Sequence, residues 1–281
     1  MTRNVWESPA IVETLRRALE EDIGPGDVTT QACVPESRTA RGRFIAREPL
    51  ILAGAPLLPI VYRLRGGVYD LVLLKNDGDR CEDGEVIAQV YGRAHTLLEC
   101  ERVALNFLQR LCGVATAARL FANCVAGTKC RVLDTRKTTP GLRLLEKFAT
   151  EAGGVTNHRL GLYDAVLIKN NHIAAAGGVR NAIERTRALS ALPIEIEVRT
   201  LAELREALDA GAERLLLDNL TPAEAAVWIS EIDGRATVEL SGGVTLENVR
   251  AYAEAGADFV SSGAMTHSAR AMDLSFRLEL A

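Results

Sequence analysis

The chain has 281 residues, enough for one large domain or two ordinary ones. Its formal net charge of -4, without a basic stripe, argues against nucleic acid as the main partner. No apolar run approaches the ~18–20 residues that a membrane span needs, and the N-terminal segment lacks the apolar core of a secretion signal. The six cysteines have no C-x-x-C pair and no metal-like spacing, so we expect free thiols and a cytoplasmic protein.

The first part of the chain predicts an α+β module of about 110 residues. A short helix is expected over 15–22, ending at Gly24. A long helix is expected from about Thr96, which has capping-box spacing to Glu99, with Gly113 as its break. Between the two helices, runs with β character and flanking turn signals predict strands over 41–48, 68–75 and 85–92.

From Lys129 onward the chain alternates strictly between predicted strands and helices. The predicted strands are 131–134, 165–168, 194–198, 214–217, 236–240 and 259–261. The helix signals are capping boxes at Thr200–Glu203 and Thr221–Glu224 and stops at Gly211 and Gly256. Such repeats imply a parallel sheet with right-handed crossovers. Alternation alone does not separate a closed barrel from an open doubly wound sheet. Polar groups end every predicted strand, and this favours a barrel, whose active site draws on all its strands.

The stretch 134–172 concentrates cations in a chain that is acidic overall. The first strand in this part runs into Arg136 and Lys137, and the second runs into Lys169. His158 and Arg159 lie between them. Cations at the carboxyl ends of parallel strands predict a pocket for a small molecule with several negative charges. His172 is expected to have a structural role.

Two glycine-rich loops follow the last two predicted strands. They are 239–244, which precedes a helix expected near Thr245, and 261–264. Paired loops of small residues at this place in a βα barrel often bind phosphate through backbone N–H groups. The alternative is that both are merely tight turns.

Glu197 and Asp218 end neighbouring predicted strands. Two carboxylates at one mouth suit Mg²⁺ held partly through water, and they could equally stabilise a developing cation. An ordinary pair of salt bridges to the nearby cations is the third interpretation. Glu195 shares a strand face with Glu197 and could line the barrel or serve only as a structural partner.

Eight segments along nearly the whole chain closely resemble the quinolinate phosphoribosyltransferase family. They are Glu21-Asp22-x-Gly-x-Gly-Asp27-x-Thr-Thr30, Glu101-Arg102-x-Ala-Leu-Asn106, Asp134-Thr-Arg-Lys-Thr-Thr-Pro-Gly141, Asn157-His-Arg159, Leu167-Ile-Lys169-x-Asn-His172, Leu217-Asp-Asn219, Ser241-Gly-Gly243 and Gly263-Ala-x-Thr-His-Ser268. The resemblance implies an N-terminal α/β sandwich domain over 1–112, joined by the C-terminal tail at about 267–281. It implies an open, irregular, TIM-like α/β barrel over 113–266, and a homodimer in which one subunit's sandwich domain caps the other's barrel.

The resemblance also implies transfer of phosphoribose from 5-phosphoribosyl 1-diphosphate (PRPP) to the nitrogen of quinolinate, with Mg²⁺. Nicotinate mononucleotide, diphosphate and CO₂ are released. Quinolinate would be bound by Arg136, His158, Arg159, Lys169 and, from the other subunit, Arg102. Lys137 and Lys169 would face the substrate carboxylate or the diphosphate, and Glu197 and Asp218 would hold Mg²⁺ and the ribose. The 5′-phosphate would be bound by Ser241, Gly242, Gly243, Gly263 and His267.

Three positions depart from the family pattern. They are Asn170, Arg199 and Leu240, and they leave the fine specificity open. One alternative is a phosphoribosyltransferase that uses another aromatic acid, such as nicotinate, without decarboxylation. The other is a related protein linked to molybdenum utilisation. The number of cations in the predicted pocket favours quinolinate, because its second carboxylate needs them.

Overall fold

The structure is a computed structural model and describes residues 5–280. The chain forms two compact units. The first contains the residues up to Arg119, Thr139–Gly154 and the residues from Ala269 on, and the second contains Leu120–Thr138 and Val155–Ser268. The chain therefore crosses between units more often than a boundary at 112/113 implies, and the expected domain limits stay a prediction.

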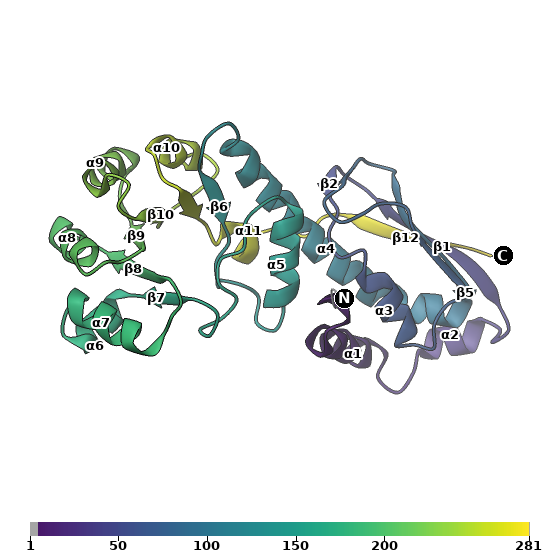
Figure 1. The fold of residues 1–281 in the computed structure, drawn as a ribbon. Helices are drawn as coiled ribbons and strands as arrows, with labels where there is room; N and C mark the ends of the chain where they lie inside the picture. Colours follow the sequence, from purple (N-terminus) through teal and green to yellow (C-terminus); the bar gives the residue numbers. More distant parts are fainter. Residues whose placement is uncertain (1–4, 281) are drawn as a thin grey trace. The chain divides into compact units, whose positions relative to one another are not determined.

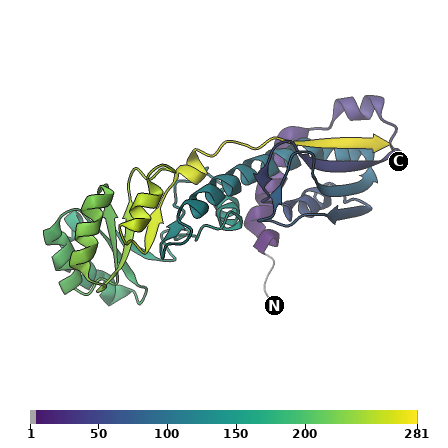
Figure 2. The same ribbon diagram turned by 90° about the horizontal axis from the view of Figure 1, so that it is seen from above.

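The first unit is built on a four-stranded antiparallel sheet in the order β12-β1-β5-β3 (Figures 1 and 2). Its strands are β12 (Leu274–Leu280), β1 (Thr39–Ala46), β5 (Val86–Arg93) and β3 (Asp70–Leu73). The C-terminal strand β12 pairs with β1 from Ala46↔Leu274 to Ala40↔Leu280. A short ribbon joins β2 (Leu50–Ile51) to β4 (Arg80–Cys81). The strands predicted over 41–48, 68–75 and 85–92 thus correspond to β1, β3 and β5.

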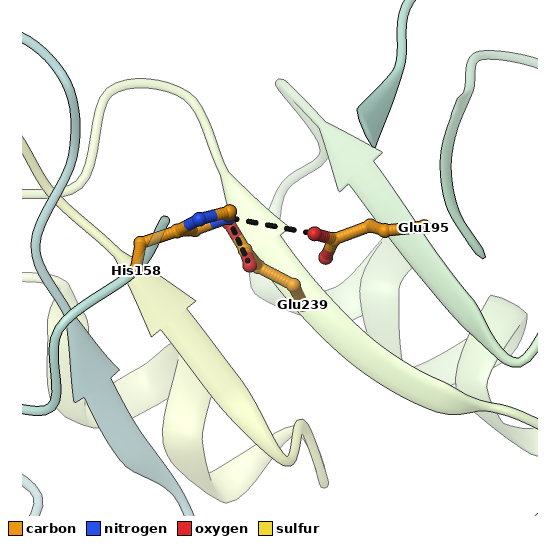
Figure 3. Close-up of side chains that lie close together, drawn as sticks. All are labelled: His158, Glu195 and Glu239. Carbon is orange, nitrogen blue, oxygen red and sulfur yellow. Dashed lines mark ion pairs between the residues drawn. The ribbon is translucent and has the colours of Figure 1, made fainter. Parts of the chain in front are cut away.

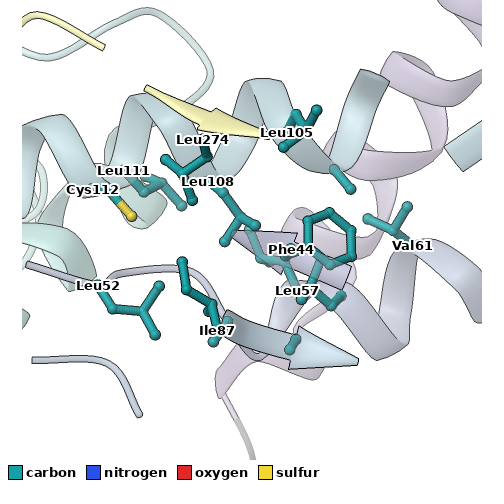
Figure 4. Close-up of a cluster of buried hydrophobic side chains, with 14 of the residues drawn as sticks. Phe44, Leu52, Leu57, Val61, Ile87, Leu105, Leu108, Leu111, Cys112 and Leu274 are labelled. Carbon is teal, nitrogen blue, oxygen red and sulfur yellow. The ribbon is translucent and has the colours of Figure 1, made fainter. Parts of the chain in front are cut away.

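Helices cover one side of this sheet (Figure 1). The helices that lie wholly or partly in this unit are η1 (Val5–Glu7), α1 (Pro9–Ile23), α2 (Val28–Cys33), α3 (Leu57–Arg63), α4 (Ala94–Cys124) and α5 (Arg143–Ala152). Phe44 and Ile87 from the sheet pack with Leu57 of α3 and Leu108 of α4 in one apolar core (Figure 4). Each is fully or almost fully buried, so each contributes roughly 1.5–3 kcal/mol of transfer free energy.

Helix α4 differs from the prediction at both points where the sequence suggested a limit. It starts at Ala94, so Thr96 lies in its first turn and is buried, and the expected capping box is wrong. It continues through Gly113 to Cys124, so the expected break is also wrong. The glycine is explained by packing, because a Cβ there would lie 1.9 Å from the carbonyl oxygen of Arg270.

The second unit is built on a six-stranded parallel sheet in the order β6-β11-β10-β9-β8-β7. Its strands are β6 (Arg131–Leu133), β7 (Val166–Ile168), β8 (Ile194–Val198), β9 (Arg214–Asp218), β10 (Thr237–Ser241) and β11 (Phe259–Ser261). Within residues 5–280 β6 and β7 do not pair, so the barrel is open there. Thr156 extends the edge of β6 through a parallel bridge to Leu133. The predicted strands and the predicted open α/β fold are confirmed.

Helices cover the outer side of this sheet (Figure 1). They are α6 (Asn170–Ala176), α7 (Val179–Leu189), α8 (Leu201–Asp209), α9 (Pro222–Ile232) and α10 (Val249–Glu254), while the short α11 (Ala264–His267) follows the carboxyl end of β11. The Thr200 hydroxyl accepts the Glu203 N–H, and Thr221 and Glu224 cap each other's backbone reciprocally, as predicted. The helix expected near Thr245 begins only at Val249, because Asn248 Oδ1 accepts the Thr245 N–H and holds a turn.

The sequence predicts that the chain has no membrane-spanning helix and that its cysteines are free thiols. No helix among residues 5–280 is both long and apolar enough to cross a membrane. The six cysteines are all free, and four of them are buried.

Gly113→Ala is expected to destabilise the first unit. Alanine raises helix propensity by about 1 kcal/mol, but the added Cβ overlaps the Arg270 carbonyl and must displace the segment that leads to β12. Overpacking of this kind outweighs the gain and lowers the free energy of unfolding by about 1–3 kcal/mol. Urea unfolding followed by circular dichroism measures the difference. A variant more stable than the wild type would show that the close approach is unimportant.

Candidate active site

The register of the parallel strands places a set of acidic side chains on one face of the sheet. Glu197 and Glu239 both lie opposite Leu216 of β9, on its two neighbouring strands. Paired residues of neighbouring strands share a face, and so do residues two apart on one strand. Glu195 therefore joins Glu197, and Asp218 joins Leu216, on the inner face of the open barrel.

Glu197, Asp218 and Lys169 gather at the carboxyl ends of β8, β9 and β7. Glu197 is buried, and burial raises the pKa of its carboxyl group. The negative charge of Asp218 adds to that rise, and the positive charge of Lys169 opposes it. Two carboxylates that disfavour each other's charge, beside an ammonium group, form an oxygen-donor set that suits a divalent cation such as Mg²⁺.

The first glycine loop lies against the end of β9. Ser241 is in register with Asp218, and the Ser241 carbonyl accepts the Asn219 N–H at 2.9 Å. Gly242 has φ +94°, and a Cβ on it would lie 2.7 Å from the Asn219 backbone nitrogen. Gly243 also has a positive φ but has open space around it. Close contact with Asn219 therefore explains why position 242 is a glycine, and backbone conformation alone explains Gly243.

The second glycine loop connects three strand ends. The Ser262 hydroxyl donates to the carbonyl of Val244 at 3.0 Å, which ties this loop to the first one. The Thr266 hydroxyl donates to the carbonyl of Lys137 at 2.8 Å. A Cβ on Gly263 would lie 3.0 Å from both the Lys137 Cδ and the His267 Cδ2. Gly263, which lies beside His267, is thus next to Lys137, and the loop that contains residues 241–243 is tied to this loop through Ser262.

His158 enters the barrel interior from the segment between α5 and β7 (Figure 3). Its Nε2 atom lies 3.4 Å from Glu195 Oε2 and 3.3 Å from Glu239 Oε2. Both carboxylates are nearly inaccessible to solvent, at 4% and 3% exposure. The backbone nitrogen of Arg159 lies 2.7 Å from Nδ1 of the same ring.

The charges around the ring determine its protonation. Burial acts to lower the pKa of His158, but hydrogen bonds with the two carboxylates and their negative charges together outweigh burial and raise it to about 9. The ring is therefore an imidazolium at neutral pH, with a proton on each nitrogen, and the Arg159 N–H can donate to Nδ1 only after the ring has lost a proton. Burial raises the pKa of Glu195. Burial also acts to raise the pKa of Glu239, but the hydrogen bond and charge of His158, together with hydrogen bonds from Ser261 and Glu195, outweigh it and lower that pKa.

The same three side chains, His158, Glu195 and Glu239, are of the types that ligate transition metals, and their donor atoms lie within 4.8 Å of one another. A metal ligand must present a lone pair at the ring nitrogen that faces the carboxylates. Because the pKa of His158 is raised to about 9, that nitrogen keeps its proton at neutral pH. The arrangement is therefore that of a hydrogen-bonded cluster.

Arg136 and Arg159 lie close enough to influence each other's charge. Burial lowers the pKa of Arg159, and the positive charge of Arg136 lowers it further. Arg159 Nη1 donates to the carbonyl of Ala165 at 3.2 Å. The completely buried Asp134 accepts the His158 N–H at 2.7 Å and thereby fixes the segment that carries Arg159.

A cavity of about 600 Å³ is lined by Arg159, Tyr163 and His172 beside β7. Neither Glu197 nor Asp218 is in its lining, so this cavity is not centred on the clustered carboxylates. His172 has the structural role expected of it, because its Nδ1 accepts the Lys169 N–H at the start of α6.

Four further positions were singled out in the sequence, and of these the charge of Arg199 acts to lower the pKa of Glu197. Arg102 is exposed on α4, in the first unit. Asn170 begins α6, and the Arg199 N–H donates to Glu203 at the start of α8. Leu240 is buried on the face of β10 opposite to Glu239 and Ser241, so its side chain does not enter the acidic face.

Comparisons with known proteins identify the family. Residues 27–112 match the model of the quinolinate phosphoribosyl transferase N-terminal domain, and residues 114–277 match that of its C-terminal domain. The chain belongs to the quinolinate phosphoribosyl transferase family. This membership confirms the predicted family and enzyme class, a decarboxylating phosphoribosyltransferase.

The individual similarities extend over almost the whole chain. A nicotinate-nucleotide pyrophosphorylase [carboxylating] of Mycobacterium leprae is 41% identical, covering 97% of this chain and 98% of that protein. A probable nicotinate-nucleotide pyrophosphorylase [carboxylating] of Bacillus subtilis is 41% identical, covering 92% and 90%. The crystal structure of NadC from Streptococcus pyogenes has a TM-score of 0.92 at 38% identity, covering 96% and 97%.

Several residues that organise this site were not predicted to do so. Asp134 ended a predicted strand, but its hydrogen bond to the His158 backbone could not be inferred. Ser262 and Thr266 tie loops together through carbonyl groups, and carbonyl acceptors leave no pattern in a sequence. The inward direction of Glu195 and Glu239 could be found from the period-two alternation of their strands.

Gly242→Ala and Gly243→Ala form a matched pair that tests the loop geometry. The second change imposes only a left-handed backbone on alanine and should lower the free energy of unfolding by about 1 kcal/mol. The first adds contact with the Asn219 backbone and should cost about 2–4 kcal/mol. Denaturant unfolding of both variants measures the costs. Equal losses would mean that the approach of Gly242 to Asn219 does not constrain the loop.

Proposed function

We propose that this chain transfers the phosphoribosyl group of PRPP to the ring nitrogen of quinolinate and decarboxylates the product. The products are nicotinate mononucleotide, diphosphate and CO₂, a step of de novo NAD biosynthesis. The observation that carries this proposal is that one sheet has both a pair of carboxylates and a group of cationic side chains at its strand ends. Glu197 and Asp218 end neighbouring strands next to Lys169, and Arg136 lies near Arg159. The names of the relatives support the same reaction.

Quinolinate is a dicarboxylate, and its binding requires several cations. Arg136 and Arg159 would bind its carboxylates, since a guanidinium group can contact both oxygens of one carboxylate. Lys169 adds an ammonium group, and Arg102 of the partner subunit would complete the site. His158 belongs to the same predicted set.

PRPP carries a phosphate on C5 of its ribose and a diphosphate on C1. The joined glycine loops at Ser241–Gly243 and Gly263, with His267, would hold the 5′-phosphate through N–H groups. Lys137, which lies against Gly263, would face the diphosphate. Glu197 and Asp218 would hold Mg²⁺, whose oxygen preference they match, and bound Mg²⁺ would neutralise charge on the leaving diphosphate.

In the first step, the quinolinate nitrogen forms a bond to ribose C1 as the bond from C1 to the diphosphate oxygen breaks. The protein's contribution is to align the two reactants and to face the cationic ribose with the carboxylates of Glu197 and Asp218. In the second step, the alkylated ring is cationic and accepts the electron pair left by departing CO₂. A proton then takes the place of that carboxylate.

Purified protein supplied with quinolinate, PRPP and Mg²⁺ is expected to release CO₂ and to form nicotinate mononucleotide in equal amounts. Nicotinate in place of quinolinate serves as the matched control, because it lacks the carboxylate that is lost, and should give little turnover. A folded protein that turns over nicotinate but not quinolinate would refute the proposal.

Arg102→Ala and Glu197→Ala test whether the active site is shared between subunits. Each variant alone should be nearly inactive. Mixing them under conditions of subunit exchange should restore up to about a quarter of the wild-type activity, since half of the dimers are hybrids with one intact site each. Arg102→Ala mixed with the Arg102→Ala/Glu197→Ala double variant is the control and should stay inactive. No recovery despite demonstrated exchange would contradict a site shared in trans.

A further inference from the structure

Asn219, the residue after Asp218, has a backbone conformation that is unusual for its place in the fold. Among residues 5–280, only Asn219 and Asp233 have a positive φ without being glycine, at 60° and 50°. Asp233 is the C-cap of α9, where a left-handed residue ordinarily ends a helix. Asn219 instead follows a strand. Glycine would adopt this conformation at no steric cost, so the amide side chain at 219 calls for an explanation of its own.

Backbone hydrogen bonds hold the turn at Asn219 from both sides. The Asn219 N–H donates to the Ser241 carbonyl at 2.9 Å, next to the pairing of β9 with β10. The Tyr252 hydroxyl donates to the carbonyl of Leu220 at 2.8 Å, and the Thr221 cap of α9 follows directly. These bonds use no atom of the Asn219 side chain, so they do not explain why that side chain is an amide.

The Asn219 side chain lies between Asp218 and the first glycine loop. Its Nδ2 atom donates to Asp218 Oδ2 at 2.6 Å. An ionised carboxylate only accepts hydrogen bonds, so the amide nitrogen must be the atom that faces Asp218. A Cβ on Gly242 would lie 2.7 Å from Asn219 Cγ, so the amide fills the space that a side chain at 242 would need. One side chain thus contacts both the Asp218 carboxylate and the loop.

The hydrogen bond restrains a carboxylate that has little else to hold it. Among residues 5–280, the amide of Asn219 is the one hydrogen-bond donor found for the Asp218 side chain. Asp218 and Glu197 disfavour each other's negative charge. Without the amide, this repulsion would turn the Asp218 carboxylate away from Glu197 and from the place where the two can share a cation.

We propose that Asn219 is a positioning residue for PRPP, which fixes the Asp218 carboxylate relative to the first glycine loop. In the proposed function Asp218 faces the ribose and Mg²⁺, and the loop binds the 5′-phosphate. One PRPP molecule contacts both places, so its affinity depends on their separation. Quinolinate is bound by other side chains and should not depend on Asn219. The inference rests on the proposed function, which assigns both places to PRPP.

Asn219→Gly separates the side chain from the backbone. Glycine accepts a positive φ, so the variant should unfold at about the wild-type urea concentration. Its KM for PRPP should rise about ten-fold, while the KM for quinolinate stays within about two-fold. Asp233→Gly makes the same change at the other left-handed position and is the control, with both KM values unchanged. An unchanged KM for PRPP in Asn219→Gly would overturn the proposal.

Asn219→Ala tests whether the effect follows the turn or the amide. This variant lacks the amide and also imposes a left-handed backbone on alanine, so it should unfold at a lower urea concentration than Asn219→Gly. Its loss of PRPP affinity should nevertheless equal that of Asn219→Gly. A loss confined to Asn219→Ala would assign the residue to the turn alone and overturn the proposal.

Direct binding measures the same effect without turnover. Phthalate has the two adjacent carboxylates of quinolinate but no ring nitrogen, so it cannot accept the phosphoribosyl group. Calorimetric titration of PRPP and Mg²⁺ into phthalate-saturated protein should give a Kd about ten-fold higher for Asn219→Gly than for the wild type. Equal values for the two proteins would contradict a role of the amide in PRPP binding.

Crystal structures of the free wild type and of free Asn219→Gly test the step through Asp218. The Asp218 carboxylate should be displaced, or adopt two conformers, once the amide is removed. An unmoved carboxylate together with weaker PRPP binding would make Asn219 a direct ligand of PRPP and overturn the proposal. Absence of both turnover and PRPP binding in the wild type would instead refute the proposed function, while the position of Asp218 in the free variant would still test the hydrogen bond.

Discussion

Carboxylates buried on one face of a parallel sheet are the constraint on which the second unit depends. Parallel strands place Glu195, Glu197, Asp218 and Glu239 on the same inner face, where an isolated charge would be costly. The inner pair is compensated by His158, which arrives on the open edge of the barrel. The outer pair stays beside Lys169 at the strand ends. On one face of the sheet, Glu195 and Glu239 thus form a buried cluster with His158, and Glu197 and Asp218 form a second group of oxygen donors at the strand ends.

The opening between β6 and β7 makes this division possible. In a closed barrel a strand would occupy that edge, whereas here the segment 155–159 lies beside β6 through the bridge of Thr156 to Leu133. This segment turns His158 inward and continues directly into Arg159. The opening between β6 and β7 therefore allows His158, which lies outside the strands, to reach the buried carboxylates of Glu195 and Glu239.

The parallel strands could be predicted from sequence to within a residue or two, because strands buried on both faces appear as short apolar runs between turn signals. Their polar ends also indicated the site, including Glu197 and Asp218. The length of α4 could not be predicted, since Gly113 is explained by Arg270, a residue far away in the chain. The start of α10 was missed because a side chain of Asn248 stabilises a turn in place of the expected helix. The partners of His158 come from two distant strands, and no local pattern indicates such a contact.

Like-charge crowding gives the proposed acceptor site its preference for a dicarboxylate. Arg136 acts against the charge of Arg159, and burial acts against it as well, so the free protein bears an electrostatic cost there. A bound carboxylate removes this cost, and two carboxylates remove more of it than one. Such a gain depends on Arg159 staying near Arg136, because a freely moving guanidinium group would relieve the repulsion by turning towards solvent. The bond of the His158 N–H to buried Asp134 and that of Arg159 Nη1 to the Ala165 carbonyl oppose this movement.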